Sequence, residues 1–529
     1  MFKFKFTYVA LAAALSSSYV YADPTVWTHS SGATVVDIET PNAAGVSHNM
    51  YRDFNVSNKG MILNNSSSDL THDTLGNIAK NNNLANGGAS VILNEVTSNK
   101  SSSLNGFIEV AGQKADVIIA NPNGISCSGC SFINTDRAVL TTGQVKLNNS
   151  GAIDSYTISQ GQITIGQNGM NATNSYAALL ANAIAINGTV STPNAAVAAG
   201  NFTLDNNTGQ MTSAGKTPTV LQMLIPEYSI DISNLGGIKA NSISMIGNDL
   251  GLGVRNKGAI VANSTLTMSS NGSLTNDGSI TSNGMLTQIA AAGNIKNTGN
   301  ISTTNTTIIN GLQTLTNNGT ISSSKQLMVS ATGNIENNGT IKSSTALSVA
   351  TNGNLKTAYG SNLLSDNQLL VSALGNIDNG GSTRAKNTSI AFSGSSLKVT
   401  GNIHGTDNLV IQSVKDKALS SGEISNSGTL KGGNVTIQTN GTLALNRDSK
   451  ILASNMLTTN SNWLNNDGGT VRGDSAVLNF NNNAMQNSGE IIGGTINIST
   501  QTHHQNKRQK QTNAQYTNHT HKKHNNNNR

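Results

Sequence analysis

The sequence predicts an all-β solenoid, in which the chain winds through many similar coils of short strands. The motif Asn-x-Gly-x-Ile occurs five times, with its glycines at Gly258, Gly278, Gly299, Gly319 and Gly339. The intervals between these glycines are 20, 21, 20 and 20 residues, which is too short for a folded domain and too regular for a loop. The apolar residues between the motifs alternate with polar ones, as in strands, and lack helical spacing.

Each coil is expected to contain two or three short strands joined by Gly/Asn corners. Asn and Gly suit such corners because both tolerate positive φ. Equivalent Asn side chains can also hydrogen-bond from coil to coil, while the isoleucines stack into a continuous core. The alternative is a low-complexity linker, but a linker would not keep isoleucine two residues after glycine in five successive repeats.

The period continues less regularly on both sides of these repeats. Gly360, Gly381 and Gly401 keep the interval, and residues 426–430 and 487–491 are late copies of the motif. If the coils stack roughly 4.8 Å apart, residues 23–500 would form roughly two dozen coils and a rod on the order of 110 Å long.

Both ends of the chain differ from the repeats. Residues 1–22 have the charged start and short apolar run of a secretory signal peptide, with a cleavage site between Ala22 and Asp23. That run is too short for a membrane anchor, so we expect an exported, soluble protein. Residues 501–529 are basic and rich in His and Asn, which predicts a disordered tail. The five histidines of the tail have no fixed geometry, so no metal site is expected.

The composition suits a solenoid better than a conventional globular core, since only 4% of the residues are aromatic and 53 are glycine. The formal charge of +6 comes from the two ends. Without the leader and the tail, 24 basic residues stand against 26 acidic ones, so the body is nearly neutral. A nucleic-acid partner is therefore not expected, and no residue pattern indicates a cofactor.

The two cysteines, Cys127 and Cys130, are separated by only two residues. In an exported chain this spacing favours a small-loop disulfide. A redox-active pair is less favoured because no βαβ pattern surrounds it, and a zinc site is less favoured because no second ligand pair lies nearby.

A series of motifs between His48 and Gly143 goes beyond solenoid character. The clearest are residues 91–96, 104–112 and 115–125. In this order they resemble the secretion domain of two-partner-secretion exoproteins, which include filamentous haemagglutinins, haemolysins and contact-dependent inhibition proteins. The resemblance assigns residues 23–270 to a secretion domain and residues 271–500 to haemagglutinin-type repeats. It implies a right-handed parallel β-helix with an N-terminal cap.

The resemblance also implies a partner, a dedicated outer-membrane barrel transporter whose periplasmic domains receive the unfolded chain. The motif implicated in this recognition is Asn121-Pro122-Asn123-Gly124. Pro122 fixes φ and Gly124 frees it, which predicts a rigid turn. Two interpretations of this motif stay open: the transporter recognises it as an export signal, or it forms a corner of the β-helix. Both hold if the transporter recognises the motif before the chain folds.

A second, weaker motif of the family is Asn-Pro-Asn-Leu. The corresponding residues here are Asn81-Asn82-Asn83-Leu84, with Asn82 in place of proline, so no ring fixes φ at this position. The Cys-x-x-Cys that follows the first motif is more similar to the haemolysin and contact-inhibition branch than to the adhesins.

The predicted function is a secreted, non-enzymatic adhesin or cytolysin of the haemagglutinin/haemolysin type, extracellular or attached to the cell surface, with a host-cell surface or membrane as target. One alternative is a contact-dependent inhibition protein without its effector domain, since family members are usually longer; a truncated or frameshifted product and a minimal exoprotein stay open. A remote alternative is a polysaccharide lyase, which would need clustered carboxylates, whereas Asp53, Asp69 and Asp73 are isolated.

Overall fold

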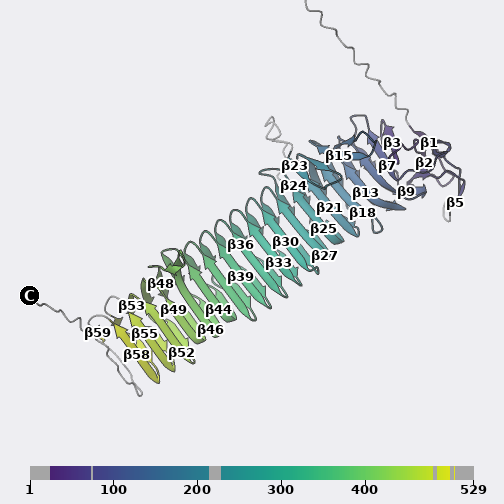
Figure 1. Cartoon of the computed structure of the whole chain (residues 1–529). Helices are drawn as coiled ribbons and strands as arrows, with labels where there is room; N and C mark the ends of the chain where they lie inside the picture. The colour runs from purple at the N-terminus through teal and green to yellow at the C-terminus, as the bar shows by residue number, and fades with distance from the viewer. Residues whose placement is uncertain (1–23, 73–75, 214–227, 481–484, 501–504, 507–529) are drawn as a thin grey trace, which may run out of the picture.

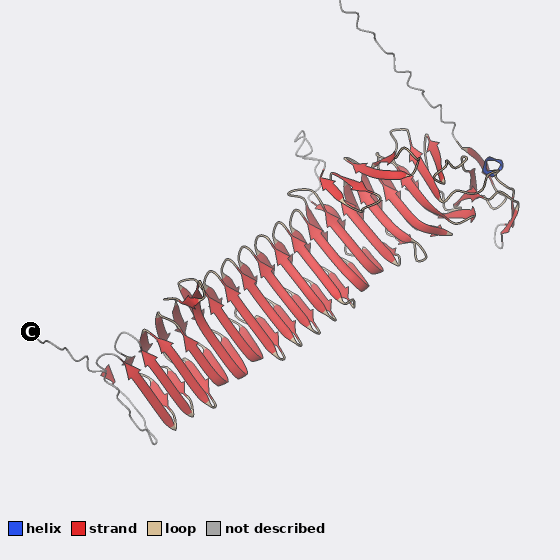
Figure 2. Ribbon diagram, viewed as in Figure 1, coloured by secondary structure: helices blue, strands red, loops and turns tan. Residues whose placement is uncertain are grey.

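The protein is an elongated parallel β-solenoid (Figure 1). The computed structural model describes residues 24–72, 76–213, 228–480, 485–500 and 505–506. These residues form about 19 turns, and their only helical element is a short 3-10 helix, η1, Asn82–Leu84 (Figure 2). The all-β parallel fold predicted from the repeats is therefore confirmed. Among the described residues, no helix has the length and apolar character needed to cross a membrane.

Three parallel ladders form the three faces of the solenoid, and one coil illustrates them. Its strands are β31 (Ile295–Asn297), β32 (Asn300–Thr303) and β33 (Thr306–Gly311). They belong to faces that we name the short-strand face, the middle face and the long-strand face. Each strand pairs in parallel with its equivalent one coil before and one coil after; β33, for example, pairs with β30 (Leu286–Ala291) and β36 (Gln326–Ala331).

The isoleucine of the repeated motif points into the core on the middle face. Side chains alternate across a strand, so every second residue of each face is buried. The equivalent isoleucines stack from coil to coil and are at most 1% exposed: Ile260, Ile280, Ile301, Ile321 and Ile341. One coil could not bury such a side chain alone, so the stack itself provides the core.

The asparagine of the same motif forms the predicted ladder of buried side chains. From Asn256 to Asn337 the five asparagines are linked by four hydrogen bonds, in which each Nδ2 donates to the Oδ1 of the next coil at 2.7–2.8 Å. The ladder ends where Thr357 replaces asparagine. It begins at Asn256, whose buried Oδ1 has no hydrogen-bond partner because Ile232 occupies the equivalent position one coil earlier.

The corner glycines are needed for a reason that the sequence did not indicate. None of Gly258, Gly278, Gly299, Gly319 and Gly339 has a left-handed φ, so the expected need for positive φ is wrong at these corners. A Cβ at each of them would instead lie 2.0–2.2 Å from the carbonyl oxygen of the equivalent glycine one coil earlier. Close approach of successive backbones therefore selects glycine here.

The first coils are covered by a cap. Strand β1 (Thr25–Thr28) pairs antiparallel with β2 (Thr34–Asp37), which begins the parallel ladder through β4 (Met61–Asn65). The hairpin of β5 (Leu70–His72) and β6 (Gly76–Ile78) lies beside them. A small apolar cluster joins these elements: Trp27, Ala33, Val35, Ile62, Leu70, Ile78, Phe107 and Ala111. The antiparallel strand and this cluster shield the first open strand edge, as an N-terminal cap must.

A second antiparallel sheet lies outside the solenoid. Its strands are β14 (Gln144–Leu147), β15 (Ile153–Ile158), β22 (Phe202–Asp205) and β23 (Met211–Ser213). It covers the outer side of the long-strand face with a buried apolar layer that includes Ile118, Val139, Tyr156, Ile158, Leu180 and Phe202. Because these residues build no coil, the expected two dozen coils were too many.

The stacked strands continue slightly past residue 500, where the repeats were expected to end. Strand β59 (Gln505–Asn506) lies in the predicted tail and pairs in parallel with β56 (Gln486–Asn487). The remainder of the tail, the predicted signal peptide and its cleavage site at Ala22 and Asp23 lie outside the described residues.

Candidate functional site

The Asn-Pro-Asn-Gly motif forms a tight turn between β10 (Ala115–Ala120) and β11 (Ile125–Cys127). The Gly124 amide donates to the carbonyl oxygen of Asn121 at 3.0 Å, which closes a β-turn. Asn123 has no positive φ, so this is a type I turn with proline in its second position and glycine in its fourth. Gly124 itself has φ +111°, a value that favours glycine. The predicted turn is therefore present.

Asn121 organises this turn from inside the protein, with a fully buried side chain. Its Nδ2 donates to the carbonyl oxygen of Lys100 and to Ser102 Oγ, both at 2.9 Å. Its Oδ1 accepts from the Asn123 amide at 2.9 Å, and its own amide donates to the carbonyl oxygen of Thr141. Asn121 thus connects three successive coils and has a structural role in the folded protein.

Pro122 and Asn123 form the accessible part of the motif. Asn123 is exposed and Pro122 is half-buried. The Asn123 Nδ2 donates to the carbonyl oxygen of Ser98 at 2.8 Å, which holds its side chain along the surface. A partner that meets the folded coil can contact these two residues, whereas it cannot reach Asn121.

The second motif forms a turn of the same kind although proline is absent. Asn81 is buried, and its Oδ1 accepts from the Asn83 amide at 2.9 Å, as Asn121 does with Asn123. Asn82 is exposed at the proline position, and Leu84 is fully buried. The first asparagine therefore organises the turn through its side chain, so the loss of the ring at position 82 does not abolish it.

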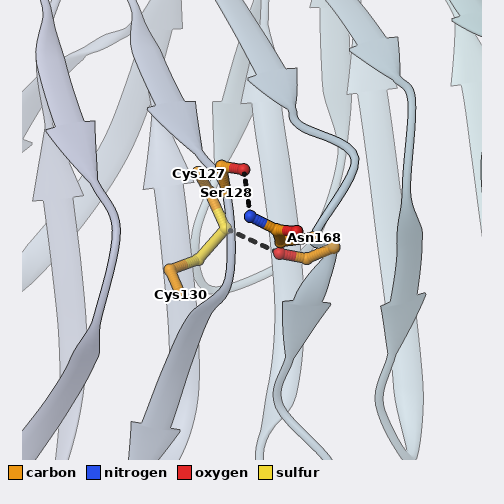
Figure 3. The surroundings of a disulfide bond; sticks show 5 residues. Cys127, Ser128, Cys130 and Asn168 are labelled. Carbon is orange, nitrogen blue, oxygen red and sulfur yellow. Dashed lines mark hydrogen bonds between the residues drawn. A yellow bond between two sulfur atoms is a disulfide. The ribbon is translucent and has the colours of Figure 1, made fainter. Parts of the chain in front are cut away.

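The cysteine pair closes the other end of β11 (Figure 3). Cys127 and Cys130 are fully buried and joined as a disulfide across the corner to β12 (Cys130–Ile133), with their Cα atoms 5.4 Å apart. In the neighbouring coils Leu104 and Ile165 occupy the position equivalent to Cys127. The disulfide thus takes the place of core side chains beside the Asn-Pro-Asn-Gly turn.

Sequence reasoning missed the residues that hold the turn, namely Ser98, Lys100, Ser102 and Thr141. The repeat period could have identified two of these residues, Ser102 and Thr141. Ser102 lies 19 residues before Asn121, and Thr141 lies 20 residues after it, so each is one coil away. The extra sheet obscured the period in this part of the chain, because it inserts residues between coils.

Titratable groups with shifted pKa values lie near the second sheet. The guanidinium carbon of Arg137 is 5.4 Å from the centre of the Tyr176 ring. Burial raises the pKa of Tyr156 to about 12, and Arg137 opposes this shift. Burial likewise raises the pKa of the Asp116 carboxyl, again opposed by Arg137. No group of three or more His, Cys, Asp or Glu side chains within the described ranges could hold a metal ion.

A family model described as the TPS secretion domain, where TPS stands for two-partner secretion, matches residues 15–282. This range is just over half of the chain. The chain belongs to the two-partner-secretion family. The family predicted from the motifs is thereby confirmed.

Known relatives of this two-partner-secretion chain include two proteins named as toxins. It is 40% identical over 256 residues to "Toxin CdiA" of Yersinia pestis and 38% identical over 246 residues to "Toxin CdiA" of Escherichia coli. These matches cover 47% and 46% of this chain but only 8% of each toxin. A solved filamentous hemagglutinin secretion domain is 34% identical, with a TM-score of 0.47, and the match covers 54% of this chain and 95% of that domain.

Proposed function

We propose that this chain is exported through a dedicated outer-membrane barrel transporter and acts outside the cell or at its surface. Membership of the two-partner-secretion family supports a secreted exoprotein with such a partner. The observation that carries the proposal is the turn Asn121–Gly124. In this turn Asn121 is buried and holds the folded coil together, whereas Pro122 and Asn123 are the accessible residues of the motif. The expected route runs through the periplasm, where receptor domains of the transporter would bind the chain.

The burial of Asn121 limits when the transporter can bind it. In the folded coil this side chain is fully buried, with all its polar atoms engaged. We propose that the receptor domains bind the motif in the unfolded chain, and that Asn121 then becomes a corner of the solenoid. Folding outside the cell would remove the signal from the transporter and favour release.

Removal of the cognate transporter tests this function directly. The full chain, expressed in a Gram-negative host with the transporter, is expected in the medium or on the cell surface. Without the transporter, the extracellular fraction should fall at least about tenfold and the chain should be retained in the periplasm. Undiminished secretion, measured by immunoblotting of the fractions, would contradict the proposal.

We propose an adhesive or cytolytic end use without enzymatic activity, directed at a host-cell surface or membrane. The second candidate is toxin delivery, because several matched relatives have names that state toxin or nuclease activity. The alignment leaves more than nine tenths of those proteins unmatched. Lysis of erythrocytes or adhesion to epithelial cells would favour the first candidate, and growth inhibition of neighbouring bacteria would favour the second.

We also propose that Cys127 and Cys130 form their disulfide in the exported protein. A loop this short is expected to stabilise the fold by about 2 kcal/mol. The double variant Cys127→Ala/Cys130→Ala and the reduced wild type should therefore unfold at similarly lowered denaturant concentrations. The variant does not respond to reductant, which makes it the control. Free thiols in the purified exoprotein, detected by mass spectrometry after alkylation, would refute the pairing.

A further inference from the structure

The outer side of the middle face carries a regular row of cations in its C-terminal half. The strand register places one residue of each coil at the same outward position. In order along the axis these residues are Lys342, Leu364, Arg384, His404, Lys431, Leu452, Arg472 and Ile492. A lysine or arginine thus occurs at every second coil. We call this set the cationic row.

The charges of the cationic row are evenly spaced and accessible. Two coils correspond to about 9–10 Å along the axis. Lys342, Arg384, Lys431 and Arg472 are exposed, and none of them forms an ion pair with another described residue. Burial lowers the pKa of His404, and Arg384 and Lys431 beside it lower it further, so His404 is neutral at pH 7. The row therefore alternates strong cations with uncharged side chains.

The short-strand face shows how the same protein neutralises a row of charges. Its outward positions on successive coils include Glu336, Lys356, Asp378 and Lys398, where each lysine has a carboxylate on a neighbouring strand. Opposite charges on adjacent strands stabilise each other and weaken the external field. The cationic row has leucine or histidine at these intervening positions. Its positive potential is therefore not offset along the ladder.

The surroundings of the row also suit a polymer. A second outward row runs parallel to it and, from Lys342 to Lys431, offers hydroxyl and amide groups: Thr340, Asn362, Ser382, Asn402 and Thr429. Towards the C-terminus this second row continues with Lys450, Thr470 and Glu490. On the other side lies a surface groove of about 470 Å³, whose lining includes Asp366 as well as Arg384, Lys386 and Thr406. The corner beside the groove also carries Asp407 and Asp474, and Asp407 pairs with Lys386 at 3.6 Å. A long anion would therefore lie over the strands and not over this corner.

We propose that the middle face binds a linear acidic polysaccharide with one carboxylate or sulfate in each disaccharide, aligned with the solenoid axis. One sugar ring is about as long as one coil is thick, so its acidic groups recur at the two-coil spacing of the cations. Leu364 and Leu452 can pack against sugar ring faces between the charges. Anionic lipid headgroups spread over a plane and favour a broad cluster of basic residues, whereas the cations here form a single row. A nucleic acid carries a phosphate on every nucleotide, which the two-coil spacing does not match.

Two charge-matched variants of the full chain test this assignment. The first is Lys342→Gln/Arg384→Gln/Lys431→Gln, in the cationic row. The control is Lys296→Gln/Lys356→Gln/Lys398→Gln, which removes three exposed cations from the short-strand face. Binding of hyaluronan oligosaccharides is measured by biolayer interferometry at low salt, with dextran and single-stranded DNA as further probes. Circular dichroism verifies that both variants keep their strand content.

The wild type and the control variant are expected to bind hyaluronan equally within about twofold. The cationic-row variant should bind about tenfold more weakly, since each exposed charge contact contributes a fraction of a kcal/mol. Dextran should not bind. The assignment is overturned if hyaluronan does not bind to the wild type, if both variants lose affinity equally, or if DNA binds as well as hyaluronan.

Discussion

Replacement of Gly319 by alanine is expected to destabilise the surrounding coils by about 1–3 kcal/mol. The new Cβ would lie 2.1 Å from the carbonyl oxygen of Gly299 and 2.7 Å from that of Thr298. Both atoms belong to the backbone of the preceding coil, so no side-chain rotation relieves the clash. The same Gly299 oxygen accepts the Thr320 amide at 3.0 Å, and separating the coils would weaken that bond.

Gly311→Ala is the matched control for this substitution. Gly311 lies in β33 of the same region and has no left-handed φ, and a Cβ added to it would lie 3.6 Å from its nearest neighbouring atom. Alanine already occupies the equivalent position in the neighbouring coils, at Ala291 and Ala331. This variant should be neutral or slightly stabilised. Hydrogen exchange of the amides in β32 and β35 (Thr320–Ser323) measures the local difference; equal protection in both variants would refute the steric argument.

The repeats in the sequence were sufficient to predict the solenoid and its two side-chain stacks. The spacing of Asn297 and Ile301 from their equivalents identifies which residues stack, because each coil repeats the same path. The spacing does not reveal why glycine occupies the corner. That reason depends on the distance between successive backbones, which the one-dimensional pattern does not contain. Positive φ was therefore a reasonable but wrong explanation.

The second sheet could not be predicted for a related reason. Its strands alternate like those of the coils, as in the buried Tyr156 and Ile158 of β15. The pattern shows that one side of a strand is buried, but not which surface covers it. Sequence alone thus counted these strands as coils and overestimated the number of turns.

The candidate site was predicted as a turn with the correct residues but without their partners. Pro122 and Gly124 indicated the turn through their backbone preferences. The contribution of the first asparagine side chain of the motif became clear only when the two motifs were compared, because Asn81 organises a similar turn without proline. Proline is therefore an addition to a turn that Asn121 already specifies.

Two single substitutions separate recognition of the motif from its structural role. Asn121→Ala should lower the free energy of unfolding by about 3 kcal/mol, because it leaves several buried hydrogen-bonding groups unpaired. Asn123→Ala removes an exposed side chain and should cost less than about 1 kcal/mol. If the transporter binds the motif in the unfolded chain, both variants should nevertheless be retained in the periplasm, each with an extracellular fraction reduced at least about tenfold.

Asn105→Ala is the control, since Asn105 is also exposed, also precedes glycine and makes one side-chain hydrogen bond to Ser103. It should be exported normally. Urea denaturation of the refolded chains measures stability, and immunoblotting of periplasm and medium measures export. Normal export of Asn123→Ala, together with poor export of the destabilised Asn121→Ala, would make the motif a folding corner only. Retention of Asn123→Ala with an intact fold requires recognition, because stability alone would leave its export unchanged.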